Sequence, residues 1–279
     1  MLITSRANPH LKQIKRLFHR RERDETGLFF AEGFQLVSEA VAMGAEIETL
    51  IVARELLSGE QVQFLESRAA IPRLEVTAKV LNSISPKDGH QGIAAVVRQR
   101  WERLENVRLG DELCWVALDR IDHPGSLGTI LRVSDSVGGR GVILIGESSD
   151  PYDPTAVRAS LGAVFSQRLV RTTFDEFAAW KREQGAFVLG TSPEAGTDYQ
   201  AVEYQPPLVV LMGSRLGLPG EEQAICDMMV RIPMVGRVDS HHVAVAVALV
   251  LYEVFDQQRA RRSRPAPGLP AVKAGRRKV

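Results

Sequence analysis

The chain alternates between short apolar runs and amphipathic stretches, and this pattern predicts strands followed by helices. The first 97 residues predict a small α/β unit, with strands at 28–31, 47–52, 74–76 and 92–97 and helices at 5–23, 34–43 and 58–69. From residue 112 the alternation becomes regular, with strands at 113–118, 141–146, 187–191 and 208–212 and helices at 128–137, 155–160, 174–183 and 221–229. Because helices join parallel strands and cover them, we expect an α/β fold with a parallel sheet buried on both faces.

Residues 232–254 are the most informative stretch, because they begin as the end of a strand and become a very apolar helix from about Val243. Pro233 removes a backbone donor and Gly236 permits a positive φ, so the chain should leave the sheet and turn sharply. Ser240 is a suitable N-cap for the helix. A loop with this much exposed backbone, next to a buried helix, indicates a site built from main-chain groups.

Changes in composition divide the chain into an N-terminal domain (1–97), a linker or bridging helix (98–111), a larger α/β domain (112–258) and a basic tail (259–279) that we expect to be disordered. With 279 residues, 44% of them hydrophobic, there is enough apolar material for both domains. The two cysteines, Cys114 and Cys226, have no metal-site or disulfide spacing, which favours a reducing cytoplasm and no metal. No signal peptide and no membrane span are expected.

The net charge of +1 conceals an acidic body with two basic ends. Residues 1–23 carry seven Lys or Arg and one acidic residue, and residues 259–279 carry eight and none. The intervening residues carry 20 basic and 33 acidic side chains, a net charge of −13. Basic tails are often only solvated, but two basic ends together favour an electrostatic grip on nucleic acid.

Two further segments follow predicted strands and carry candidate chemistry. In residues 117–146, a loop with Pro124, Gly125, Ser126 and Gly128 opens a helix that holds Arg132, which we expect to point back toward the loop where anions bind. On spacing alone, an ordinary surface arginine is the more common case. In residues 208–222, a buried strand runs into a glycine-rich loop, which is weak evidence by itself. There is no G-x-G-x-x-G dinucleotide motif.

The histidines of the third segment suggest a hydrolase triad or a metal site, and both interpretations are weak. His241 and His242 follow Asp239 and Ser240 directly, but no G-x-S-x-G elbow is present. Adjacent histidines on a loop also lack the i, i+4 spacing of helical metal ligands.

Taken together, the segments resemble the SpoU (TrmH) family of S-adenosylmethionine-dependent RNA 2′-O-ribose methyltransferases, which belong to the trefoil-knot superfamily. The resemblance implies that residues 112–258 form a methyltransferase domain with a deep C-terminal trefoil knot and that residues 1–97 form a small α/β RNA-binding domain. It also implies a homodimer, an S-adenosylmethionine cofactor and an RNA partner. The family holds the cofactor largely through backbone groups, at positions matching Gly213, Ile232 and His241 here. Met234 and Val243 are expected beside them.

The sequence departs from the family motifs at three polar positions. Ser126 stands where the first motif has Asn, Arg215 follows Gly213 where the second has Glu, and His242 stands where the third has Asn. The resemblance assigns Arg132, across the dimer, to orienting the ribose hydroxyl or handling its proton. Ser126 can still donate and accept a hydrogen bond, and His242 can supply a titratable base or a structural contact. For RNA phosphates we select Arg6, Lys12, Lys15, Arg16 and Arg215.

The leading hypothesis is therefore an RNA 2′-O-methyltransferase, with ribosomal RNA favoured over transfer RNA because of the additional N-terminal domain. The main alternative is a catalytically inactive SpoU-like RNA-binding protein, because three motif positions are altered together. A small-molecule α/β enzyme is a third reading, which the basic ends and the missing dinucleotide motif disfavour.

Overall fold

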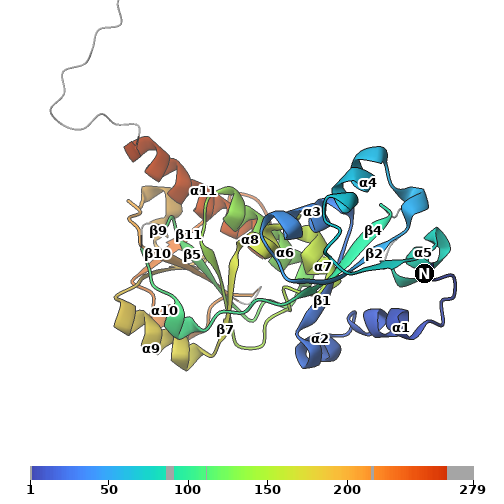
Figure 1. The fold of residues 1–279 in the computed structure, drawn as a ribbon. Helices are drawn as coiled ribbons and strands as arrows, with labels where there is room; N and C mark the ends of the chain where they lie inside the picture. The colour runs from blue at the N-terminus through green and yellow to red at the C-terminus, as the bar shows by residue number, and fades with distance from the viewer. Residues whose placement is uncertain (1, 86–90, 111, 215–216, 263–279) are drawn as a thin grey trace, which may run out of the picture.

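The computed structural model describes residues 2–85, 91–110, 112–214 and 217–262, which form two α/β domains side by side (Figure 1). The N-terminal domain has a four-stranded sheet in the order β1-β4-β2-β3. Its strands are β1 (Leu28–Glu32), β2 (Ile47–Val52), β3 (Arg73–Glu75) and β4 (Ile93–Arg98). Strand β4 runs antiparallel to β1 and β2, whereas β2 and β3 are parallel. The helices are α1 (Pro9–Arg16), α2 (Arg20–Thr26), α3 (Phe34–Ala42), α4 (Gly59–Glu66) and α5 (Ala78–Ile84), with a 3₁₀ turn η1 (Arg54–Leu56).

The basic helix predicted over 5–23 is two helices, α1 and α2. The side chain of Asn8 caps α1 by accepting a hydrogen bond from the His10 N–H, and Pro9 occupies the first turn, so the helix begins later than predicted. After Arg16 the chain tightens into i→i−3 hydrogen bonds and breaks. The break lets Phe18 pack edge-on against Phe30 of β1, with ring centroids 5.4 Å apart, so tertiary packing overrides the helical periodicity.

The C-terminal domain is built on a seven-stranded sheet in the order β7-β6-β5-β10-β8-β11-β9, and all its pairs are parallel, as predicted. The strands are β5 (Trp115–Asp119), β6 (Gly141–Ile145), β7 (Arg168–Thr172), β8 (Phe187–Thr191), β9 (Thr197–Asp198), β10 (Leu208–Met212) and β11 (Met228–Arg231). The helices are α6 (Pro124–Ser136), α7 (Pro154–Ala159), α8 (Ala163–Ser166), α9 (Phe174–Gln184), α10 (Gly220–Ala224) and α11 (Val243–Arg262), with 3₁₀ turns η2 (Leu104–Asn106) and η3 (Tyr199–Ala201).

Both faces of this sheet are buried, as the apolar runs predict. Val116 and Leu118 of β5 point into the cluster formed with α6 and α11, whereas Trp115 and Ala117 point to the opposite face and pack with α9. Figure 1 shows α11 above the strands and α9 and α10 below them.

Several predicted elements differ from the structure for identifiable reasons. Strand β7 was not predicted because only Leu169 and Val170 are buried, between arginines that an edge strand tolerates. The helix predicted over 221–229 ends at Ala224, because the following residues form β11 and pair with β8. Helices α5 and α8 and the short strand β9 were also not predicted. Helix α11 continues to Arg262, four residues into the range assigned to the tail, and residues 263–279 lie outside the described part of the chain.

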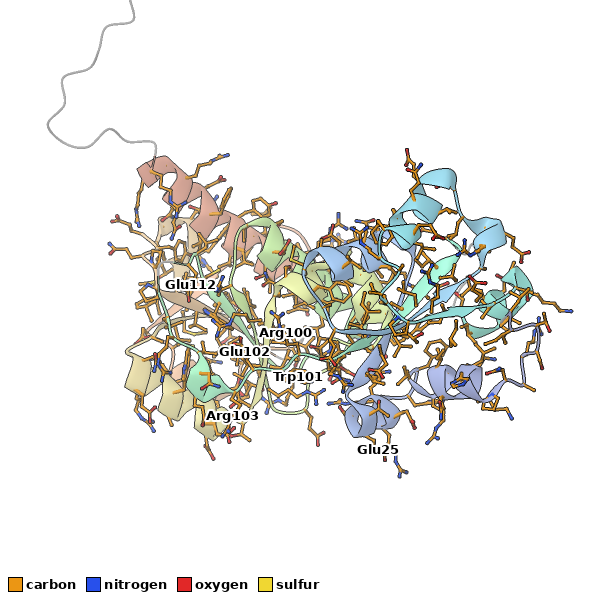
Figure 2. All side chains as sticks on the ribbon, in the orientation of Figure 1. Glu25, Arg100, Trp101, Glu102, Arg103 and Glu112 are labelled. Atoms are coloured by element: carbon orange, nitrogen blue, oxygen red, sulfur yellow. The ribbon has the colours of Figure 1, made fainter. Side chains whose placement is uncertain are left out.

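The segment between the domains is not a bridging helix. Residues 99–110 form an extended stretch with only the short turn η2, and Figure 2 labels Arg100 to Arg103 along it. Glu102 forms a parallel bridge with Val170 of β7. Leu104 and Val107 are buried in the core beside α9, so the segment is packed onto the C-terminal domain. One hydrophobic cluster runs across both domains, and the two therefore share a continuous core.

Candidate functional site

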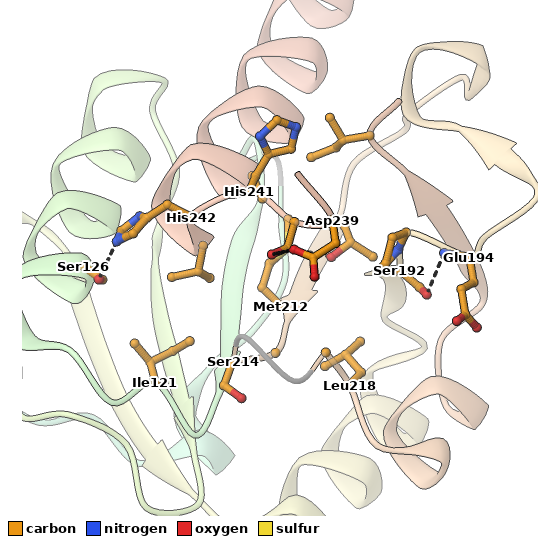
Figure 3. A pocket seen from close by; sticks show the side chains of 18 of the residues that line it. Ile121, Ser126, Ser192, Glu194, Met212, Ser214, Leu218, Asp239, His241 and His242 are labelled. Atoms are coloured by element: carbon orange, nitrogen blue, oxygen red, sulfur yellow. Dashed lines mark hydrogen bonds between the residues drawn. The ribbon is translucent and has the colours of Figure 1, made fainter. Parts of the chain in front are cut away.

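A cavity of about 680 Å³ lies at the carboxyl edge of the parallel sheet, where the chain leaves β5, β8, β10 and β11 (Figure 3). Carboxyl ends of parallel strands are the usual place for ligands in open α/β sheets. The described residues that line the cavity come from four segments of the chain: Ile121, Asp122, His123, Ser126, Thr191, Ser192, Pro193, Glu194, Met212, Gly213, Ser214, Gly217, Leu218, Gln223, Ile232, Met234, Asp239, Ser240, His241, His242, Val243 and Ala246.

The five positions predicted for the cofactor all line this cavity. Gly213 follows β10, Ile232 and Met234 follow β11, and His241 and Val243 lead into α11. At Gly213 any Cβ would collide with the backbone of Gly217, so this turn requires glycine. The structure thus brings together loops that are distant in sequence and leaves their backbone groups around one space.

Two of the altered motif positions touch each other. Ser126 Oγ lies 3.1 Å from His242 Nε2. Figure 3 draws this hydrogen bond as a dashed line. The Ala244 N–H donates to His242 Nδ1 over 3.3 Å, which makes Nδ1 an acceptor and places the proton of a neutral ring on Nε2. The imidazole then donates to Ser126, whose own hydroxyl proton remains available. Ser126 and His242 are thus one coupled pair, whereas Arg215 lies outside the described residues.

Ser126 belongs to a helix, where the sequence had suggested a loop. Helix α6 begins at Pro124, because proline is well suited to the first helical position, and Ser126 is in its first turn. The side chain is 7% exposed. Two residues further along α6, only glycine fits at position 128, since a Cβ there would collide with the Ala156 backbone of α7.

Arg132 does not reach the cavity. The earlier start of α6 places it more than two turns into the helix, and its side chain is exposed and absent from the described lining. Within the described part of the chain it forms no hydrogen bond or ion pair. It lies on the side of α6 that borders α11, where Ser136 Oγ is 3.4 Å from the Tyr252 hydroxyl. The expectation that Arg132 points back to its own loop is therefore wrong for the isolated chain.

The cavity is acidic. Asp122, Glu194 and Asp239 line it, and its described lining contains no lysine or arginine. Carboxylates stabilise a cationic ligand and repel a phosphate. The geometry thus favours a positively charged small molecule inside the cavity, with any phosphate contact supplied from outside it.

Thr191, Ser192, Pro193 and Glu194 line the cavity but were not singled out from the sequence. Thr191 is the last residue of β8 and the other three follow it, and the pairing of β8 with β10 brings this end beside Gly213. The signal was available, because any loop after a predicted parallel strand lies at this edge.

A buried carboxyl pair lies beside the cavity. Asp119, at the end of β5, and Glu222, on α10, are each 1% exposed, and the negative charge of Asp119 disfavours ionisation of Glu222. The Arg120 guanidinium lies 2.6 Å from Asp119 and 3.2 Å from Glu222, on a residue with a φ of 44°. Burial and the neighbouring Asp119 raise the pKa of Glu222 to about 7, and burial also raises the pKa of Asp119.

The predicted RNA contacts of the N-terminal domain lie on or near α1. Arg6 and Lys12 are exposed and Lys15 is half-buried, and none of the three has an ion-pair partner within the described residues. Arg16 instead pairs with Glu22 at 2.7 Å. The described residues contain no cluster of three metal-ligating side chains, and no described helix is long and apolar enough to cross a membrane.

Comparison with known proteins identifies relatives along nearly the whole chain. Residues 114–252 match the SpoU rRNA Methylase family, and residues 8–95 match the MRM3-like substrate binding domain. A 23S rRNA (uridine(2479)-2′-O)-methyltransferase of Streptomyces viridochromogenes is 30% identical, with 95% of each chain covered.

Solved structures agree with this likeness. An AdoMet-bound rRNA methyltransferase from Sinorhizobium meliloti has 34% identity and a TM-score of 0.85, covering 95% of this chain and 99% of its own. The SpoU methyltransferase AviRb from Streptomyces viridochromogenes, in complex with AdoMet, has 27% identity and a TM-score of 0.82, covering 91% of this chain and 99% of its own. With these relatives matched over almost their full length, the chain belongs to the SpoU family of rRNA methylases.

Proposed function

We propose that this protein is an S-adenosylmethionine-dependent 2′-O-ribose methyltransferase that acts on ribosomal RNA. The observation that carries the proposal is the acidic cavity at which the loops after β5, β8, β10 and β11 meet. Two relatives that match 95% and 90% of the chain are named as 23S rRNA 2′-O-methyltransferases, which does not favour an inactive RNA-binding protein. Since the proposed substrate is ribosomal RNA, the cytoplasm remains the predicted compartment.

The residues around the cavity fit S-adenosylmethionine. The close approach of Gly213 to Gly217 leaves backbone rather than side chains at the cavity wall, and the cavity volume is in the usual range for cofactor sites. The backbone of Gly213, Ile232 and His241 would hold the cofactor, with Met234 and Val243 as apolar neighbours. When bound, the cofactor supplies an electrophilic methyl group on a sulfonium sulfur. The carboxylates of the lining offset that positive charge.

Ser126 and His242 orient the ribose in this proposal. With Nε2 of His242 donating to Ser126 Oγ, the Ser126 hydroxyl proton is free to be donated to a substrate oxygen. The pair thereby replaces the two asparagines that the family motifs have at these positions. A base role for His242 requires the other tautomer or an empty Nε2, so the present hydrogen bonds favour orientation over proton abstraction.

Arg132 acts from the partner subunit of a homodimer in this proposal. Val245 and Tyr252 are each 47% exposed and lie seven residues apart, on one face of α11. This apolar face adjoins the side of α6 that carries Arg132. An exposed apolar helix face indicates an interface. A second copy packed there would present Arg132 to the neighbouring cavity, where its planar guanidinium can hold the ribose or a phosphate.

The N-terminal domain binds the RNA, through Arg6, Lys12 and Lys15, which have no described ion-pair partner. Arg16 can contribute only if it leaves Glu22. The acidic cavity makes such a separate grip necessary, because the cavity itself repels phosphate. We also propose that the C-terminal domain contains the trefoil knot. Two observations support this: the loops after β10 and β11 meet at one cavity, and α11 packs on α6.

Mapping of 2′-O-methylation in the RNA of a deletion strain, combined with transfer of a labelled methyl group by the purified protein, tests this function. We expect one ribosomal position to lose its methyl group in the deletion strain and to regain it with the purified protein. Wild-type protein that binds the cofactor but methylates no cellular RNA would overturn the proposal.

The action of Arg132 across the dimer can be tested by mixing two inactive variants. Arg132→Ala removes the guanidinium, and Gly213→Val blocks the cavity of its own chain. A mixed dimer contains one intact cavity that faces one intact Arg132 only if the arginine acts on the partner. We expect the mixture to regain activity that neither variant has. Failure to regain activity in verified mixed dimers would place Arg132 elsewhere.

A further inference from the structure

An arginine from the N-terminal domain is buried at the junction with the C-terminal domain. Arg23 of α2 is 1% exposed, and its Nε donates to Asp150 Oδ2 over 2.7 Å. A second nitrogen donates to the Leu17 carbonyl at 2.9 Å, and a third lies 3.4 Å from Asp153. Asp150 is itself 4% exposed and also accepts from the Tyr152 N–H. Every edge of this guanidinium therefore has a partner, and two of the partners belong to the other domain.

A partly exposed layer of contacts surrounds this pair. Arg171 of β7 donates to Asp24 of α2 over 3.2 Å and lies over the Trp101 ring, 3.9 Å from its centroid. Arg20 donates to the Ser148 carbonyl over 3.1 Å. Figure 2 shows Trp101 at the junction between the domains. Helix α2 is thus tied to the segment 148–153 and to β7 at several points.

The same segment forms the outer support of the cavity wall. The Ile121 N–H donates to Ser148 Oγ at 3.3 Å, and the Ser149 N–H donates to the Ile121 carbonyl at 2.6 Å. Ile121 is buried and lines the cavity. A short chain of hydrogen bonds therefore leads from α2, through residues 148–153, to the cavity.

A buried ion pair is a poor choice for stability alone, because apolar residues of similar size serve as well or better. The junction already has apolar contacts, since the Phe29 ring lies 4.6 Å from the Tyr152 ring and 6.0 Å from the Phe165 ring. Apolar packing permits several orientations, whereas a guanidinium with directed hydrogen bonds permits few. The geometry of the pair therefore indicates a role in orientation.

We infer that Arg23 is a positioning residue, which fixes the N-terminal domain at one angle so that bound RNA presents its ribose to the cavity. The inference rests on the proposed RNA-binding function of that domain. It predicts that loss of Arg23 leaves RNA affinity and cofactor affinity almost unchanged but slows methyl transfer from the bound complex. A displacement of about 1 Å at the reacting atoms can cost on the order of 100-fold in rate.

The test compares Arg23→Met with Arg21→Met, which removes an arginine of the same helix that is 87% exposed and, among the described residues, paired only with Glu25. Spin labels on cysteines at positions 60 and 256, in a Cys226→Ser background, report the distance between the domains. For Arg23→Met we expect a broadened distance distribution, an RNA affinity within about threefold of wild type and a single-turnover rate lower by about 100-fold. Arg21→Met should change none of the three.

A second variant covers the case in which Arg23→Met fails to fold. Arg171→Gln keeps the Arg23–Asp150 hydrogen bond and removes the outer contacts together with the longer ion pair of Arg171 with Asp150, 3.7 Å, so it should broaden the distances less and slow transfer less. In whichever of the two variants folds, a distance distribution as narrow as that of wild type would overturn the inference. A normal transfer rate in a variant with broadened distances would overturn it too. The distances are measured without RNA, and wild type is assayed in parallel, so an error in the proposed RNA function is detected separately as inactive wild-type protein.

Discussion

Arg23 at the domain junction and Arg132 on α6 place the same side chain in opposite surroundings. Arg23 is 1% exposed and donates hydrogen bonds to the Leu17 carbonyl and to two aspartates. Arg132 is exposed and has no described partner. A guanidinium whose N–H groups are hydrogen-bonded within the protein can stabilise only the fold. A guanidinium without such partners has its planar set of donors available for a ligand. The surroundings of each arginine, rather than its residue type, distinguish positioning from chemistry.

The largest expected effect is on stability at the junction. Arg23→Ala removes the nearer of the two cations of the buried Asp150 and leaves only Arg171, 3.7 Å away, so it should lower the free energy of unfolding by about 3–5 kcal/mol. Arg21→Ala, which breaks an exposed pair, should cost less than about 1 kcal/mol. Urea unfolding followed by circular dichroism measures both. The double variant Arg23→Met, Asp150→Leu removes both charges and should recover much of the lost free energy of unfolding. If none is recovered, the two charged groups stabilise the fold by more than their interaction with each other.

The corresponding effect at Arg132 should appear in catalysis. Arg132→Ala is expected to lower the rate of methyl transfer by about 100- to 1000-fold, the usual cost of removing one donor to the reacting group. Unfolding and cofactor affinity should stay unchanged, because the side chain has no described contact. Arg132→Lys should also be poor, since an ammonium lacks the planar fork. Arg140→Ala, an exposed arginine at the opposite edge of the sheet, is the matched control. Equal activity of Arg132→Ala and Arg140→Ala would remove Arg132 from the mechanism.

A third prediction uses pH to compare the buried Glu222 with the exposed Glu221 beside it. The pKa of Glu222 is raised to about 7 in the folded protein, above its ordinary value of 4.5, so the folded state holds a proton that the unfolded state releases. The contribution of Glu222 to stability should therefore be greatest below about pH 4.5 and be lost as the pH rises through about 7, by on the order of 1–3 kcal/mol. Interaction with Arg120 reduces this loss.

Glu222→Gln should flatten that dependence and be more stable than wild type at pH 8. Glu221→Gln, next to it and exposed, should follow the wild-type curve. Thermal unfolding at several pH values is a sufficient measurement. A wild-type curve that is level between pH 5 and 8 would contradict the raised pKa of Glu222.

The smallest expected effect concerns the Ser126–His242 pair. Ser126→Ala and His242→Ala should each weaken methyl transfer, and their combination should show a coupling energy of about 0.5–1.5 kcal/mol, as for one hydrogen bond. His242→Asn, which restores the usual family residue, should keep activity and leave its pH profile unchanged. A changed pH profile would instead support His242 as a base.

The fold followed from the sequence wherever periodicity and burial agreed. The parallel sheet and most of its helices were predicted, because apolar runs such as 208–212 are buried on both sides. Strand β7 and the split between α1 and α2 were not predicted, because Arg171 and Phe18 act there through tertiary contacts that have no local pattern.

The site was predictable to a similar extent. The loops that carry Gly213 and Ile232 were recognised by resemblance, and the structure brings them to one cavity. The contact between Ser126 and His242 joins residues 116 positions apart, so two departures that looked independent are one. The outward position of Arg132 depends on where α6 begins, and element boundaries are the least certain part of any sequence pattern.

The central place of β10 has a consequence for how the chain is made. It lies between β5 and β8, and its residue Val209 is paired with Trp115. Until residues 208–212 have emerged from the ribosome, no strand lies between β5 and β8, and the sheet cannot form. The cavity needs still later residues, up to Val243. A growing chain can therefore form the sheet of its N-terminal domain from residues 28–98, whereas its ligand site must wait until residues beyond Val243 have emerged from the ribosome.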